Sequence, residues 1–182
     1  MNKKFLKIAQ FKGVDLVRLN MSHLSILALK KNLKFIKKFS NLKICIDTEG
    51  AQIRTKVERN KILKKGQKIS IFKNKKFHLY PIDVYEKLKK NDYLEVGFDG
   101  LILKILKKDK NSILTECTQS GSLEKNKGVH LSNRKIKLNF LTKKDFEAIK
   151  VGKKFKIKNY ALSFTNSVND IVKFSKLLPK EK

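Results

Sequence analysis

The sequence predicts an α/β chain that is interrupted by a small all-β domain. Apolar runs alternate with amphipathic helical patterns near both ends of the chain, whereas short β-like runs separated by turn residues fill the middle. Hydrophobic residues make up 41% of the 182 residues, which is enough for a core. We therefore expect residues 1–55 and 131–182 to form a partial α/β unit, and residues 56–130 to form an inserted β-domain.

The first α/β segment is predicted between residues 14 and 48. "VDLVRLN" (14–20) and "LKICIDT" (42–48) are apolar enough for buried parallel strands. Between them, apolar residues recur at helical spacing at Ile26, Leu29, Leu33 and Ile36. Ser22 is the expected N-cap of this helix. A strand, a helix and a strand of this kind form a right-handed βαβ unit.

The middle of the chain has the pattern of a small barrel or sandwich. Its β-like runs are "KISIFK", "YLEVG", "LILKIL" and "SILTEC", with turns expected at Gly66, Gly100 and Gly121. The helical pattern then returns, and Thr142 with Asp145 fits a capping box. "YALSF" (160–164) predicts a third parallel strand, followed by a helix that Ser167 caps.

Polar residues follow the first two parallel strands where each strand ends. Arg18, Asn20 and Ser22 lie at the end of one, and Asp47 and Thr48 at the end of the next. The carboxyl ends of parallel strands meet at one edge of a sheet, so we expect these residues to converge there. An arginine in an apolar run requires an anionic partner. That partner is either a bound ligand or Asp47 in a buried ion pair, and both alternatives predict that Arg18 lies close to Asp47.

The net charge of +28 is consistent with binding to nucleic acid, but the composition favours codon bias. Only four of the 44 basic residues are arginine, the residue that base and phosphate contacts favour. Lysine, asparagine and isoleucine are abundant throughout, as in proteins from AT-rich genomes. Five aromatic residues of the β-domain could stack on bases, although core packing explains them more simply: Phe72, Phe77, Tyr80, Tyr85 and Tyr93.

Cysteine usage and hydropathy predict a cytoplasmic protein with no membrane partner. Cys45 and Cys117 lie far apart and form no CxxC pair, which is typical of a reducing compartment. No run approaches the ~20 apolar residues of a membrane-spanning helix. Lysines interrupt the apolar positions of the N-terminus, which therefore lacks the apolar region of a signal peptide.

Five segments, in order, resemble motifs of the pyruvate kinase family. They are "GVDLVRLNMSH", "IDTEGAQIRT", "VGFDGLI", "NKGVHLSNRKIKLNFLTKKDFEAI" and "YALSFTNSVNDI". The first resembles the family pattern R-[LI]-N-[FM]-S-H, and the second resembles D-T-K-G-P-E-I-R-T. The resemblance covers nearly the whole chain. It implies part of a (β/α)8 barrel with a small β-domain inserted after the third strand.

The resemblance also implies a role for each matching residue. Arg18 would help to hold the phosphoryl group of phosphoenolpyruvate. Asn20, Ser22, Asp47 and Thr48 would form a K+ site, Thr48 through its backbone carbonyl, and hard cations prefer such oxygen ligands. The implied nucleotide site consists of Asn20, Ser22, His23 and Arg54.

Several family residues are missing or replaced. The 182 residues contain neither the K-I-E motif, with the catalytic lysine and a Mg2+ ligand, nor R-G-D-L-G, with a second Mg2+ ligand. The family's first barrel strand has no counterpart before residue 14. Glu49 replaces the family's lysine, and we expect its charge to lie near the phosphate-facing site and to weaken nucleotide binding. No catalytic residue is therefore assigned, and the isolated chain is expected to be inactive.

Three hypotheses follow. In the first, the chain keeps the phosphoryl and potassium half-site, and transfers phosphate from phosphoenolpyruvate to ADP only when a partner chain completes the barrel. In the second, it is a non-catalytic homologue that binds a phosphorylated ligand or a protein. In the third, which the composition favours least, it is a basic module that binds RNA or DNA. Three parallel strands leave exposed sheet edges, which a protein partner or a second copy of the chain would cover.

Overall fold

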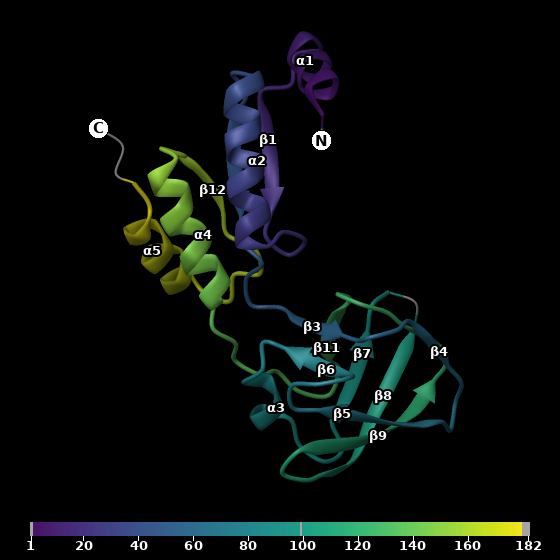
Figure 1. Cartoon of the computed structure of the whole chain (residues 1–182). Coiled ribbons are helices and arrows are strands. Elements are labelled where there is room, and N and C mark those ends of the chain that lie inside the picture. Colours follow the sequence, from purple (N-terminus) through teal and green to yellow (C-terminus); the bar gives the residue numbers. More distant parts are fainter. Residues whose placement is uncertain (1, 99, 180–182) are drawn as a thin grey trace. The chain divides into compact units, whose positions relative to one another are not determined.

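The computed structural model describes residues 2–98 and 100–179 and divides the chain into two compact units. Met1–Ala51 together with Asn139–Lys182 forms the first unit, and Gln52–Leu138 forms the second (Figure 1). The second unit extends beyond the range 56–130 at both ends. A β-strand over Ile53–Lys56 belongs to it, and Ile136 and Leu138 pack against its core.

The first unit contains a three-stranded parallel sheet. Its strands are β1 (Leu16–Asn20), β2 (Lys43–Asp47) and β12 (Asn159–Ala161), in the order β1-β2-β12. Both Asn20 and Ala161 lie opposite Asp47 in the register, so all three strands end at the same level. The parallel βαβ arrangement predicted from the sequence is confirmed.

Helices α2 (Ile26–Phe39) and α4 (Lys143–Lys154) cover one face of this sheet (Figure 1). The core between them is formed by Leu29, Leu33 and Ile36 of α2, Ile44 and Ile46 of β2, and Ala148 and Val151 of α4. The expected stripe of α2 thus faces the sheet, except that Ile26 is only partly buried. Two further helices, α1 (Lys3–Phe11) and α5 (Val168–Leu177), complete the unit.

The helix starts confirm two of the predicted caps and correct one. Thr142 and Asp145 form the expected capping box of α4, and Ser167 accepts the N–H of Asp170 at the start of α5. The N-cap of α2 is Ser25, not Ser22. Ser22 lies in the turn after β1, where its N–H donates to Oδ1 of Asn20, so the helix begins one turn later.

The second unit is a small closed β-barrel. Its strands are β3 (Ile53–Lys56), β5 (Lys68–Phe72), β6 (His78–Tyr80), β7 (Tyr93–Val96), β8 (Leu101–Lys108), β9 (Ser112–Gln119) and β11 (Gly128–Leu131). Neighbouring strands are antiparallel apart from β5 and β6. Strands β4 (Lys61–Leu63) and β10 (Gly121–Leu123) form a separate pair, and α3 (Val84–Lys87) is a single turn.

The barrel core accounts for two of the aromatic residues considered for base stacking. Phe77 and Tyr85 are buried within it, so neither presents a ring to a nucleic acid. Cys45 and Cys117 are buried free thiols that lie in different units. None of the helices in the described part of the chain is both long and apolar enough to cross a membrane.

Candidate functional site

Arg18 and Asp47 form an ion pair across the neighbouring strands β1 and β2. Nε and Nη2 of Arg18 donate to Oδ2 of Asp47 at 2.8 and 2.6 Å. The predicted proximity of these two side chains is confirmed. The Asp47 side chain is only 2% exposed, whereas the Arg18 side chain is 61% exposed. The pair is therefore not sealed in the interior, and a ligand in solution can reach the guanidinium.

Ser163 completes the surroundings of Asp47 and was not predicted from the sequence. Its hydroxyl donates to Oδ1 of Asp47 at 2.7 Å, and its N–H donates to Oγ1 of Thr48 at 3.0 Å. Both carboxylate oxygens of Asp47 are therefore fixed, one by Arg18 and one by Ser163. The third strand was predicted to run to residue 164, but β12 ends at Ala161, so Ser163 follows the strand and lies at the edge where all three strands end.

Asn20, Ser22 and Thr48 lie at the same edge. The N–H of Met21 donates to the Asp47 carbonyl, and the N–H of Thr48 donates to the Ala161 carbonyl, so the sheet pairing continues past the strand ends. Asn20 and Ser22 are joined by the hydrogen bond in the turn, and Thr48 is 1% exposed. The five residues expected to converge, Arg18, Asn20, Ser22, Asp47 and Thr48, thus share one sheet edge.

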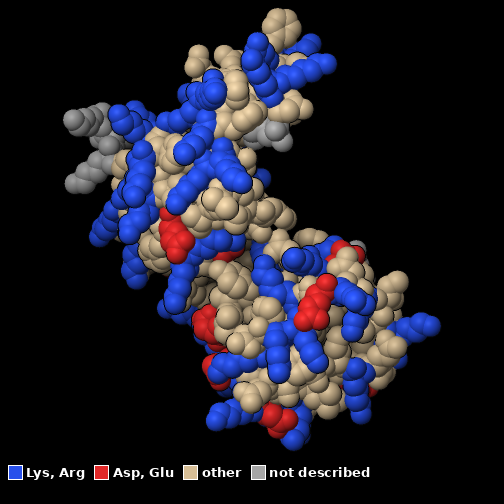
Figure 2. All heavy atoms as spheres, in the orientation of Figure 1, with Lys and Arg blue, Asp and Glu red and all other residues tan. Residues whose placement is uncertain are grey.

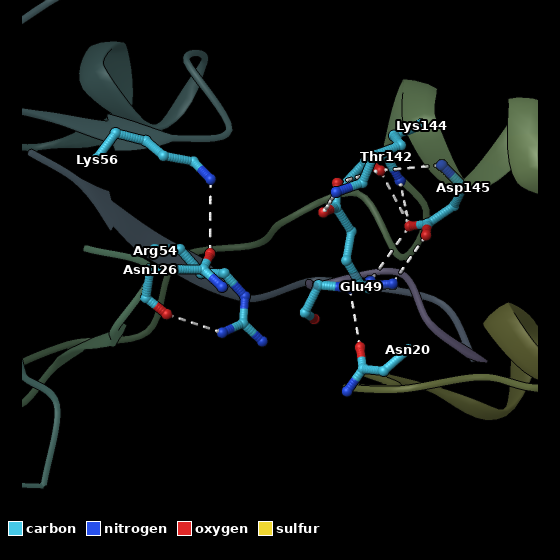
Figure 3. Close-up of polar contacts among 10 residues, drawn as sticks. Asn20, Glu49, Arg54, Lys56, Asn126, Thr142, Lys144 and Asp145 are labelled. Carbon is cyan, nitrogen blue, oxygen red and sulfur yellow. Dashed lines mark hydrogen bonds and ion pairs between the residues drawn. The ribbon is translucent and has the colours of Figure 1, made fainter. Parts of the chain in front are cut away.

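The residues of the implied nucleotide site are distributed over both units. His23 is exposed in the turn after β1. Arg54 lies on β3 of the barrel, where its Nη1 donates to the carbonyl of Asn126 at 3.3 Å. Lys56 on the same strand donates to the side chain of Asn126 at 3.5 Å (Figure 3).

The Glu49 side chain is buried and paired with residues at the start of α4. Its side chain is 4% exposed, accepts the hydroxyl of Thr142 at 2.7 Å and forms an ion pair with Lys144 of α4 (Figure 3). Lys144 therefore offsets the charge of Glu49, and the effect of this residue on nucleotide binding stays a prediction. The glutamate at the position of the family's lysine could be seen in the sequence. Its ion-pair partner, Lys144, lies 95 positions further along the chain and could not be predicted.

The loop after β2 is held against the start of α4 by Asp145. Its carboxylate accepts the N–H groups of Glu49 at 2.8 Å, Gly50 at 3.2 Å and Thr142 at 3.0 Å. Burial raises the pKa of Asp145; the three N–H groups counteract part of this effect, and the nearby Glu49 charge adds to it. Gly50 has φ +65°, and a Cβ there would lie 2.1 Å from the Ser163 carbonyl oxygen, so only glycine fits.

The oxygen atoms at the sheet edge suit a monovalent cation. Asn20, Ser22, Asp47 and Thr48 offer an amide, a hydroxyl, a carboxylate and a backbone carbonyl oxygen, which are ligands for hard cations. Arg18 already offsets the single carboxylate charge, which disfavours a divalent ion. Within residues 2–98 and 100–179, no three His, Cys, Asp or Glu residues are grouped so that they could hold a metal ion.

Residues 2–182 match the family model described as pyruvate kinase, barrel domain. A curated pyruvate kinase of Staphylococcus epidermidis (strain RP62A) is 27% identical over 186 aligned positions, which cover 93% of this chain and 32% of the relative. A pyruvate kinase of Staphylococcus aureus (strain USA300) has the same identity and coverage. The chain thus spans about a third of the length of these relatives.

Proposed function

Because the chain belongs to the pyruvate kinase family, we propose that it provides the part of a pyruvate kinase active site that binds a phosphoryl group and K+. The observation that carries this proposal is the half-exposed pair of Arg18 and Asp47. A guanidinium that solvent can reach binds phosphoryl oxygens well. The neighbouring oxygens of Asn20, Ser22 and Thr48 suit K+, which the phosphoryl group would approach from the same edge.

The proposal includes the fold and the substrates. The three parallel strands of the first unit would be consecutive strands of a (β/α)8 barrel, and the β-barrel would be the domain inserted into it. Phosphoenolpyruvate would contact Arg18, and a nucleotide would contact Asn20, Ser22 and His23 of the first unit. Mg2+, which the family requires, would be held by further residues of the family's barrel, and phosphoryl transfer would need those residues together with the ones described here.

Calorimetric titration of the chain with phosphoenolpyruvate tests the proposal. We expect weak binding that is stronger in potassium chloride than in tetramethylammonium chloride of equal ionic strength. Losing a charge-assisted hydrogen-bonding pair costs about 1.5–3 kcal/mol, so Arg18→Ala should weaken binding about ten- to a hundredfold. Arg59, which is exposed on the barrel, provides the matched control, and Arg59→Ala should leave the affinity within a factor of about two.

Two results would overturn the proposal. The first is an affinity for phosphoenolpyruvate that Arg18→Ala and Arg59→Ala reduce equally, because general attraction to a chain of charge +28 would then explain binding. The second is turnover of phosphoenolpyruvate and ADP by the isolated chain at an ordinary enzymatic rate. Such turnover would show that these 182 residues hold a complete active site rather than part of one.

A further inference from the structure

A cleft lies at the opposite edge of the sheet from Arg18 and Asp47, where β2 and β12 begin. Its volume is about 570 Å3, which falls within the range of about 300–1,000 Å3 that is typical of small-molecule sites. Residues 37, 40–44 and 156–159 line it, and all of them belong to the first unit. Four of the lining side chains are lysines, at positions 37, 43, 156 and 158.

No carboxylate of the described residues lines this cleft. Among the described residues, Lys43, Lys156 and Lys158 have no ion-pair partner, and Lys37 donates to the backbone carbonyl of Phe155. Like charges gathered around a concave, partly apolar surface repel one another and create a positive potential. A bound anion would relieve this repulsion.

The acidic residues of the first unit are concentrated away from the cleft. They lie at or just after the end of β2, or near the starts of α4 and α5, at the carboxyl edge of the sheet: Asp47, Glu49, Asp145, Glu147 and Asp170. Asp15, just before β1, is the one described carboxylate at the cleft's edge of the sheet, and its backbone carbonyl pairs with Lys43. In Figure 2, Lys and Arg side chains accordingly cover the upper ends of α2 and α4, as these helices are oriented in Figure 1.

Stabilisation of the helix ends explains only part of the positive charge of the lysines that line the cleft. Lysines in the last turn of a helix interact favourably with its dipole, and Lys37 belongs to the last turn of α2. Lys43 and Lys158 lie away from the helix ends, so that explanation does not apply to them, whereas Lys156 directly follows the C-cap of α4. At least two charges therefore lie at the cleft without a structural role that the fold requires.

The remaining lining residues indicate the kind of anion. Leu42, Ile44 and Ile157 form an apolar floor, and Ser40, Asn41 and Asn159 add neutral hydrogen-bonding groups. Several ammonium groups match a chain of phosphates, and the floor and amides can contact an attached uncharged group. We propose that this cleft binds a small ligand with an oligophosphate chain, either free or as part of a nucleotide.

Titration of the full chain with tripolyphosphate, and separately with ATP in EDTA, tests this proposal at near-physiological ionic strength. The triple variant Lys43→Ala, Lys156→Ala, Lys158→Ala removes the three lysines outside the helices. The matched control Lys65→Ala, Lys90→Ala, Lys110→Ala removes the same charge from exposed positions of the barrel. Thermal unfolding of both variants checks that each remains folded.

We expect the cleft variant to lose at least about tenfold in affinity for tripolyphosphate, and the control to lose less than about threefold. Tighter binding of ATP than of tripolyphosphate would identify a nucleotide as the ligand, and equal binding would identify the phosphate chain alone. The amide signals of Asn41 and Asn159 should shift on titration. Equal losses in both variants, or no binding of either probe, would overturn the proposal.

Discussion

Asp145 and Glu49 are 96 positions apart in the sequence, yet the Asp145 carboxylate accepts the Glu49 backbone N–H at 2.8 Å in the buried interior of the first unit. The same carboxylate caps α4 and binds Gly50. One side chain therefore fixes both the start of a helix and the loop that follows Asp47. Because that loop carries Thr48, the position of the sheet-edge oxygens depends on Asp145.

We predict that Asp145→Ala destabilises the first unit by about 2–5 kcal/mol, because several buried N–H groups would lose their acceptor. Urea unfolding followed by a probe in the first unit would measure this loss. Glu147→Ala is the control, since Glu147 is exposed on the same helix and should change stability by less than about 0.5 kcal/mol. Similar effects of the two substitutions would contradict the role assigned to Asp145.

The barrel contains an ion pair whose contribution to stability depends on pH. Arg134 donates to both carboxylate oxygens of Asp92 at 2.7 Å, and the Asp92 side chain is 3% exposed. Burial acts to raise the pKa of Asp92, but hydrogen bonds from Arg134 and from the N–H of Lys89 outweigh it, so the pKa is lowered. The folded barrel thus binds the Asp92 proton less readily than the unfolded chain does.

We therefore predict that the stability from Asp92 is complete above its ordinary pKa of about 3.9 and is lost as the pH falls through the lower folded value. Asp92→Asn should destabilise the barrel at neutral pH by about 2–4 kcal/mol and flatten this acid limb. Lys73→Ala removes an exposed ion pair with Glu86 and should leave the stability of the barrel nearly unchanged. Urea unfolding at several pH values would measure both effects, and an unchanged acid limb in Asp92→Asn would disprove the assignment.

The sequence predicted the parts of the fold that depend on local patterns. The apolar runs of β1 and β2, the stripe of α2 and the capping box of α4 each depend on residues a few positions apart, and each was found. Helix α1 was not predicted, because lysines interrupt its apolar positions and only Leu6 among its residues is buried. The short strands β4, β6 and β10, of three residues each, carry too little pattern to recognise.

For the candidate site, the residues at the strand ends could be predicted from the sequence, but most of their side-chain partners could not. Arg18 and Asp47 could be paired because parallel strands with a helical crossover end at one edge. Ser163 and the partners of Glu49 depend on the side-chain directions of distant segments, and no local pattern specifies these. The sequence showed that position 49 has a glutamate where the family has a lysine. It did not show that Lys144 neutralises this glutamate.

A close contact between Gly152 and Tyr160 reverses the usual effect of alanine in a helix. Gly152 lies within α4, where alanine is ordinarily favoured over glycine by about 1 kcal/mol. A Cβ at this position would lie 2.4 Å from Oη of Tyr160 and 2.7 Å from Cδ1 of Ile46. We predict that Gly152→Ala lowers the melting temperature. A raised melting temperature would show that the core of the first unit is packed differently.

Tyr160 itself gives a separate prediction. Its Oη is buried without a hydrogen-bond partner among the described residues, and burial raises its pKa to about 12. Tyr160→Phe removes the unsatisfied hydroxyl, so we expect unchanged or increased stability rather than the loss of about 1 kcal/mol that is usual for a hydrogen-bonded tyrosine. Combined with Gly152→Ala, it should also relieve part of the clash, which thermal unfolding of the double variant would detect.

Charge reversal at Glu49 and Lys144 tests whether their ion pair stabilises the first unit. Glu49→Lys restores the residue type of the family pattern, yet here it would place two ammonium groups together at a largely buried position. We expect a loss of about 3–5 kcal/mol, since an uncompensated buried charge remains. Lys144→Glu alone should also destabilise, because it sets two carboxylates against each other beside Asp145.

The double variant Glu49→Lys, Lys144→Glu restores opposite charges, so it should recover a substantial part of the stability lost in either single variant. Denaturant unfolding of the four proteins in this cycle would give the coupling energy directly. Exchanging the two charges cannot recover all of the lost stability. The Thr142 hydroxyl donates to Glu49, and a lysine at position 49 cannot accept that hydrogen bond. Additive losses in the double variant would mean that Glu49 and Lys144 do not stabilise each other, and that the loop after β2 is held by Asp145 alone.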